Sequence, residues 1–178
     1  TLGEGRHPIR YRAYDMGGNQ EAERTLEIRS DASAPLSSLA VQGGRQATGP
    51  DALRIYASAD TRIAFSAADP IVSDVASGVE AILWRDNGGA FQTYSAPLAL
   101  AEGSHLLAYQ GRDRVQNTET LRSTTVLVDA TAPQTAFQIG TPAFIDLSGT
   151  RYITPTTPLT FTSHAPALPG GVAGAGVD

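Results

Sequence analysis

Apolar and polar residues alternate with a period of two along most of the chain. Ile63, Phe65 and Ala67 fall on one side of an extended segment, and Leu107 and Tyr109 repeat the pattern further on. Successive side chains of a strand point to opposite faces, so this alternation indicates strands with one side buried. No stretch carries the three-and-four spacing of an amphipathic helix. The pattern predicts strands at residues 37–42, 53–58, 61–68, 78–85, 90–95, 104–113 and 118–129.

Turn signals separate these segments. Asn87-Gly88 stands between two of them, and this pair favours a type I′ hairpin because both residues tolerate positive φ. Residues 15–19 and 113–117 each begin with Asp and end with Asn. Asp and Asn side chains bond nearby backbone N–H groups, so both segments are expected to form the turn into a last strand. Seven short strands with such turns indicate an antiparallel β-sandwich.

The chain also repeats itself at a spacing of 98 residues. Residues 1–35 align on 99–133 without a gap and share 13 identities in 35 positions. About 100 residues is the size of an immunoglobulin-like sandwich, well above the unit of a solenoid. We therefore divide the chain into the C-terminal part of one repeat at 1–33, a complete repeat at 34–131, and the N-terminal part of a third repeat at 132–178.

Ten residues stand at the structural positions of this repeat. The two equivalent histidines, at 7 and 105, are interpreted as corner residues whose rings bond the backbone of the preceding Leu-x-Glu-Gly turn. A metal-binding or catalytic histidine is the alternative. The proline of each Asp-Ala-x-Ala-Pro segment ends the last strand, since it cannot donate to the sheet. The ten are His7, Asp15, Asn19, Pro35, Asn87, Gly88, His105, Asp113, Asn117 and Pro133.

Residues 77–94 read SGVEAILWRDNGGAFQTY, and LAEGSH, DRVQN and VDATAP follow in order. This succession resembles the Ig-like, fibronectin-type-III-like tandem repeats of large bacterial surface and secreted proteins. The resemblance implies an all-β chain of tandem Ig-like antiparallel β-sandwiches at an extracellular or cell-surface location in a bacterium. One departure concerns Gln116, which replaces the turn glycine that Gly18 supplies in the first copy, so a differently shaped turn is expected there.

Composition excludes several classes of function. The formal net charge of −5 is thinly spread and forms no basic stripe, so nucleic acid is not an expected partner. No apolar run approaches the ~20 residues that cross a bilayer, so no membrane insertion is expected within this segment. The chain has no cysteine, which removes disulfides and cysteine-bound metals.

Two clusters are candidates for ligand binding. Carboxylates in or beside the loop after strand 61–68 could bind calcium, although their spacing matches no known calcium loop, and otherwise no cofactor is expected. Aromatic side chains around the Asn-Gly hairpin could stack on a carbohydrate, or could simply pack in the core and across strands. The calcium candidates are Asp69, Asp74 and Glu80, and the carbohydrate candidates are Trp84, Phe91 and Tyr94.

No nucleophile elbow, metal-binding histidine pair or phosphate loop is present, so no catalytic residue and no enzyme activity are expected. We expect a non-catalytic repeat of a stalk, fibre or filament, partnered by neighbouring repeats of the same chain or by identical chains. The alternatives are an adhesin or carbohydrate-binding module that uses loops 69–77 and 43–52 on cell-surface glycans, and an accessory domain of a secreted hydrolase. The incomplete outer repeats indicate either a longer tandem array or completion by a neighbouring subunit.

Overall fold

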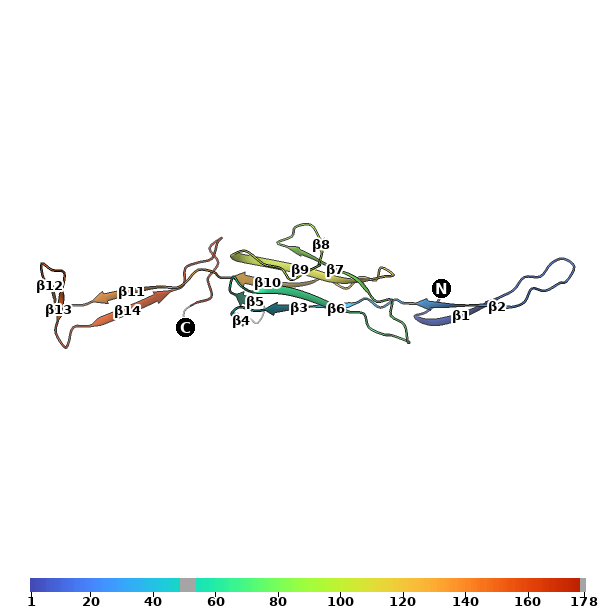
Figure 1. Ribbon diagram of the computed structural model, residues 1–178, viewed down its shortest axis with the longest axis horizontal. Helices are drawn as coiled ribbons and strands as arrows, with labels where there is room; N and C mark the ends of the chain where they lie inside the picture. Colours follow the sequence, from blue (N-terminus) through green and yellow to red (C-terminus); the bar gives the residue numbers. More distant parts are fainter. Residues whose placement is uncertain (49–53, 177–178) are drawn as a thin grey trace. The chain divides into compact units, whose positions relative to one another are not determined.

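The computed structural model describes residues 1–48 and 54–176, and every regular element in them is a β-strand (Figure 1). The all-β prediction is therefore confirmed. The described residues contain no helix that is long and apolar enough to span a membrane. The strands are β1 (Gly5–Tyr11), β2 (Arg24–Ser30), β3 (Leu36–Gln42), β4 (Gln46–Thr48), β5 (Arg54–Ala57), β6 (Arg62–Ala68), β7 (Val79–Asp86), β8 (Gln92–Thr93), β9 (Gly103–Asp113), β10 (Arg122–Val128), β11 (Gln134–Ile139), β12 (Ala143–Ile145), β13 (Arg151–Ile153) and β14 (Leu159–His164).

Two compact units divide the chain. The first comprises Thr1–Gly43, Arg62–Ala99 and Leu106–Thr124, and the second comprises Gly44–Thr61, Leu100–His105 and Thr125–Asp178. The first unit holds the antiparallel pairs β1–β2 and β3–β6. The second holds the antiparallel pairs β4–β5, β11–β14 and β12–β13.

One six-stranded sheet has the order β4-β5-β10-β9-β7-β8. The expectation of purely antiparallel sheets is wrong here, because β5 pairs with β10 in parallel, from Arg54 opposite Thr125 to Ala57 opposite Val128. All seven predicted strands of the complete repeat are present with small changes at their ends. The strand expected at 118–129 begins only at Arg122, and the one expected at 90–95 shrinks to β8. Residue 53, the expected start of β5, lies outside the described residues. The apolar pattern of the sequence did not predict β4. This short polar segment is a strand because it pairs with β5.

The apolar faces of β6, β7 and β9 meet around one phenylalanine in the first unit. The ring centroid of Phe65 lies 4.9 Å from that of Tyr109, 5.2 Å from that of Tyr94 and 6.3 Å from that of Trp84. Ile63 and Phe65 are buried, as the alternation of β6 predicts. Aromatic rings at these separations add about 0.5–1.5 kcal/mol per pair to the gain from burial.

The predicted hairpin turn is confirmed after β7. Asn87 and Gly88 have φ values of 47° and 76°, and the Gly89 N–H donates to the Asp86 carbonyl over 2.9 Å. Positive φ at both central positions is the mark of a type I′ turn, whose twist matches that of the flanking strands.

The turn at 113–117 does not differ in shape from the turn at 15–19, and the expectation of a different turn is wrong. Gln116 has a φ of 75° and Gly18 a φ of 84°. The closing bonds also match, because the Asn117 N–H and the Asn19 N–H each donate over 2.8 Å to the aspartate that opens the turn. These shared bonds to the aspartate impose the glycine-like conformation on a residue that carries a side chain.

Replacing Gln116 by glycine should therefore raise the free energy of unfolding by about 1 kcal/mol. A side chain in the left-handed region costs roughly 1–2 kcal/mol, and the greater freedom of glycine in the unfolded chain offsets part of that gain. Urea unfolding followed by the fluorescence of Trp84, the single tryptophan, measures the change. Gln116→Ala is the control, because it removes the 3.1 Å bond to Glu80 but keeps the Cβ. Equal stability of the two variants would contradict the argument.

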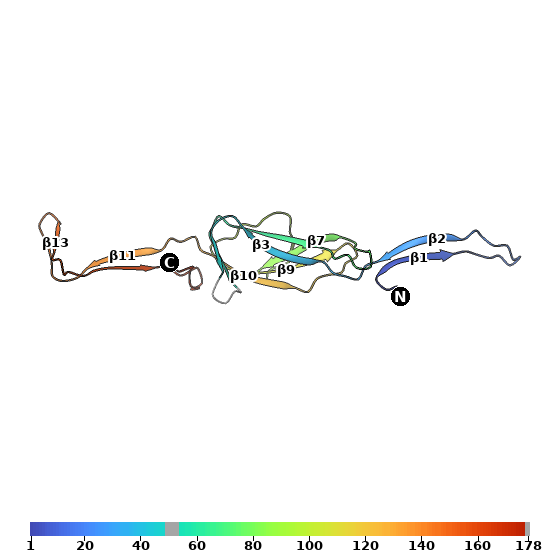
Figure 2. The same cartoon turned by 90° about the horizontal axis from the view of Figure 1, so that it is seen from below.

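The outer segments form two-stranded sheets, which are β1-β2 at one end of the sequence and β11-β14 and β12-β13 at the other. Strands β1 and β2 lie side by side, with Gly5 opposite Ser30 and Tyr11 opposite Arg24 (Figure 2). In the sequence repeat, β1 and β2 correspond to β9 and β10, while β11 and β14 correspond to β3 and β6. These outer pairs leave large apolar side chains exposed, among them Tyr11, Leu26, Phe137, Leu159 and Phe161.

Candidate functional site

Three aspartates from distant parts of the sequence converge in the first unit. Asp31 follows β2, Asp69 follows β6 and Asp113 ends β9. Each contributes a carboxylate oxygen, and these three oxygens lie within 4.8 Å of one another. Asp113 is fully buried and the other two are half-buried. The cluster joins the end of the first partial repeat to a loop and a turn of the complete repeat.

Backbone N–H groups occupy most of these carboxylate oxygens. Asp31 accepts from the Ser77 N–H over 2.6 Å, and Asp69 accepts from the Gly78 N–H over 2.6 Å. Asp113 accepts from two backbone N–H groups within its own turn. Through these bonds the cluster anchors loop backbone whether or not an ion is bound.

The donor set would suit a hard cation such as Ca²⁺, which prefers carboxylate, carbonyl and hydroxyl oxygens. Asp69 Oδ1 in this cluster and Ser77 Oγ, whose N–H binds Asp31, are buried without a hydrogen-bond partner among the described residues. Of the three calcium candidates in the sequence, the cluster takes in Asp69 and leaves out Asp74 and Glu80. Glu80 instead forms an ion pair of 2.8 Å with Arg112.

The anchoring contact occurs twice, once in each unit. Asp31 accepts from the Ser77 N–H, and Asp129 accepts from the Ala175 N–H over 2.7 Å. Asp129 lies 98 residues after Asp31, and Ala175 lies 98 residues after Ser77, so the two contacts are equivalent in the sequence repeat. The other oxygen of each aspartate binds the N–H two residues further on, at 3.1 Å in both copies. The Asp of Asp-Ala-x-Ala-Pro thus ties the end of one repeat to the backbone of Ser77 or Ala175 in the next.

The sequence does not predict that Asp31 and Asp113 belong to one cluster, because 82 residues separate them. A usable signal existed nonetheless, because both belong to motifs that recur at the 98-residue spacing. A polar residue that recurs in a repeat, where the apolar pattern does not need it, indicates a structural contact. Only the folded chain shows that these two motifs meet.

A second buried carboxylate holds the start of the complete repeat. Glu119 Oε2 accepts from the Ser37 N–H over 2.9 Å, from the Gly111 N–H over 3.1 Å, and from the Ser37 hydroxyl. Its other oxygen pairs with Arg122. Glu119 therefore links β3, β9 and the segment that leads into β10.

The pKa values of Asp31 and Glu119 both lie below the ordinary carboxyl values. Burial raises the pKa of Asp31, but the Ser77 and Ser33 bonds outweigh it. Burial likewise raises the pKa of Glu119, and the bonds from Ser37, Gly111 and Arg122 outweigh it. Both groups are therefore ionised in the folded chain at neutral pH.

Acid should destabilise the fold through these two groups. A carboxyl whose pKa is lower in the folded state adds stability above its unfolded pKa, about 4, and that stability is lost as the pH falls through the folded value. The urea midpoint should thus be constant near neutral pH and fall below about pH 5. Asp31→Asn should flatten the fall without abolishing it, because Glu119 remains. A midpoint that rises on acidification would refute the assignment.

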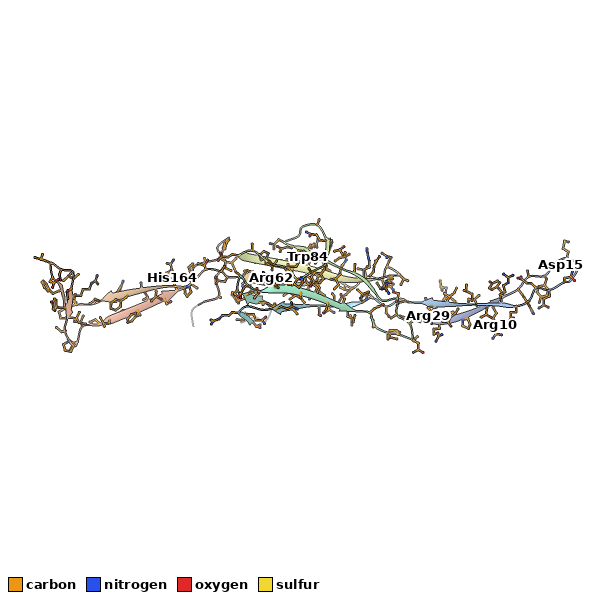
Figure 3. All side chains as sticks on the ribbon, in the orientation of Figure 1. Arg10, Asp15, Arg29, Arg62, Trp84 and His164 are labelled. Carbon is orange, nitrogen blue, oxygen red and sulfur yellow. The ribbon has the colours of Figure 1, made fainter. Side chains whose placement is uncertain are left out.

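The two equivalent histidines occupy equivalent turns. The Nε2–H of His7 donates to the Gly3 carbonyl over 2.8 Å, and that of His105 donates to the Ala101 carbonyl over 2.9 Å. Each ring thereby closes the Leu-x-Glu-Gly turn before its strand. His164 lies at the exposed end of β14, as Figure 3 shows.

The aromatic candidates separate into two environments. Trp84 and Tyr94 lie against the ring of Phe65, and Figure 3 shows Trp84 within the central strands. Phe91 is partly exposed, and the guanidinium of Arg85 lies 4.6 Å from its ring centroid. The structure therefore does not assemble the three rings into one exposed platform. Of the loops in the binding-module alternative, 43–52 contains β4, and residues 49–52 lie outside the described part of the chain.

No protein-family model and no curated protein matches this chain.

Proposed function

We propose that this chain is a non-catalytic structural segment of an extracellular bacterial stalk, fibre or filament, built from tandem Ig-like β-sandwiches. The observation that carries the proposal is the recurring aspartate contact, Asp31 to Ser77 and Asp129 to Ala175. A contact that recurs at every repeat boundary serves the array as a whole rather than a single ligand site.

The role of each repeat is mechanical. Pro35 and Pro133 end one repeat and begin the next, which leaves almost no linker between them. The aspartate bond, part-buried at Asp31 and exposed at Asp129, then restricts the range of angles between successive repeats, because bending would unpair the N–H group that it holds. Each additional repeat adds length and stiffness, and the partners are neighbouring repeats or identical chains.

Immunogold labelling of intact, unpermeabilised cells that make the native protein tests this function. An antibody raised against the 178-residue polypeptide should label filaments or stalks outside the cell. An antibody against a cytoplasmic protein is the matched control, and it should label only permeabilised cells. Label for this protein that appears only after permeabilisation would overturn the extracellular role.

A further inference from the structure

The carboxylates of Asp31, Asp69 and Asp113 lie together without a basic side chain on any of them. One oxygen of each lies within 4.8 Å of the other two, and ionised carboxylates at this separation repel one another. The chain has no lysine, and in the part that the structure describes no arginine lies within ion-pair distance of the three. Asp113 is fully buried, and buried charges in proteins are normally paired or bound to a metal.

Two unpartnered oxygens point to a ligand independently of the acidic cluster. Asp69 Oδ1 and Ser77 Oγ each expose less than 1 Å² and have no hydrogen-bond partner among the described residues. The Ser77 N–H donates to Asp31 over 2.6 Å, which places this side chain beside the cluster. The Ser77 carbonyl accepts from Arg114 over 3.1 Å, so the hydroxyl is the polar group of Ser77 that is left over. A buried oxygen without a partner is unfavourable unless a ligand contacts it.

We propose that Asp31, Asp69, Asp113 and Ser77 bind one Ca²⁺ ion. Calcium takes carboxylate, hydroxyl and water oxygens at about 2.3–2.6 Å, so two oxygens on one ion lie no more than about 5 Å apart. The three carboxylate oxygens meet this condition. A carboxylate has about four lone-pair sites, so one that accepts backbone bonds can still bind an ion. Water would complete the remaining positions of the ion.

The next repeat boundary lacks this set of ligands. Asp129 repeats the backbone contact of Asp31, but Ala175 takes the place of Ser77. Residues 165–167, which align with Asp69, read Ala-Pro-Ala. We therefore expect one calcium ion per 178-residue chain. Since Asp31 ends the first repeat and the other three ligands belong to the complete repeat, the ion adds a second tie across that boundary. This inference goes beyond the proposed stalk function and does not depend on it.

Isothermal titration of the chelator-treated chain with calcium chloride tests the site. The wild-type chain should bind one equivalent with a Kd of about 10⁻⁴–10⁻³ M, the range of extracellular calcium modules. Asp69→Asn should weaken binding about tenfold or more, because it removes one charged ligand. Asp74→Asn is the matched control, because it makes the same charge change in the same loop outside the cluster, and it should bind like the wild type. Magnesium chloride should give no comparable binding, because Mg²⁺ needs a tighter octahedral shell.

Ser77→Ala separates calcium binding from a purely structural role of the serine. Without calcium its urea midpoint should equal or exceed that of the wild type, because alanine keeps the N–H bond to Asp31 and removes a buried, unpaired hydroxyl. Millimolar calcium should raise the midpoint of the wild type more than that of Ser77→Ala, because the variant has one ligand fewer. A serine with a structural role alone would shift the midpoint equally with and without calcium.

Three results would each overturn the calcium site. They are no binding to the wild-type chain at up to about 10 mM calcium, well above the range of such modules, equal affinity of Asp69→Asn and the wild type, and an equal calcium effect on Ser77→Ala and the wild type. Any of them would leave the proposed function standing, because backbone bonds hold this boundary without an ion. Calcium binding by a chain whose immunogold label appears only inside the cell would refute the function alone.

Discussion

Replacing Glu119 by alanine is expected to lower the free energy of unfolding of the first unit by about 3–4 kcal/mol. Its carboxylate accepts from the Ser37 and Gly111 N–H groups in a buried site. Alanine would leave both backbone donors buried without an acceptor, at a cost of about 1–3 kcal/mol each. The lost pairing with Arg122 adds little, because the arginine is half exposed and remains solvated. Urea unfolding followed by Trp84 fluorescence and circular dichroism measures the effect.

The repeat supplies an internal control for this experiment. Glu21 is the equivalent of Glu119, and its carboxylate pairs with Arg24 at a partly exposed site. Glu21→Ala should change the unfolding free energy by less than about 1 kcal/mol when measured on dilute, monomeric protein. Glu119→Gln should fall between the two, because its amide oxygen can still accept from the backbone. Equal losses for Glu119→Ala and Glu21→Ala would refute the buried network.

Much of the fold could be predicted because strand periodicity and turn chemistry act locally. The alternation around Ile63 and Leu107 identified the buried faces, and Asn87-Gly88 identified the hairpin. The prediction failed at two places where a hydrogen-bond partner, rather than the residue type, decides the backbone conformation. β4 is a strand through its pairing with β5, and Gln116 adopts a glycine-like φ through bonds to Asp113.

The candidate site was only partly predictable for the same reason. Asp69 was singled out as a loop carboxylate, but its neighbours in space, Asp31 and Asp113, are 38 and 44 residues away in sequence. Sequence distance hides such a cluster until the strands that carry its members are placed. Glu80, which is closer in sequence, pairs with Arg112 on the adjacent strand instead.

The second large effect is expected from Phe65→Ala, which should cost about 3–5 kcal/mol. Phe65 is buried against three aromatic rings, so removing it takes away apolar contact and leaves a cavity that the sheets cannot fully close. Phe65→Leu should cost less, because leucine fills most of the volume but loses the ring contacts. The urea midpoint, followed by circular dichroism as well as by Trp84 emission, reports the change independently of the altered tryptophan environment.

Phe161→Ala is the matched control, since Phe161 takes the place of Phe65 in the third repeat and is largely exposed. In dilute, monomeric protein it should leave the urea midpoint almost unchanged, because little apolar surface is lost from the interior. A Phe161→Ala chain that lost as much stability as Phe65→Ala while monomeric would show that the third repeat closes its own core.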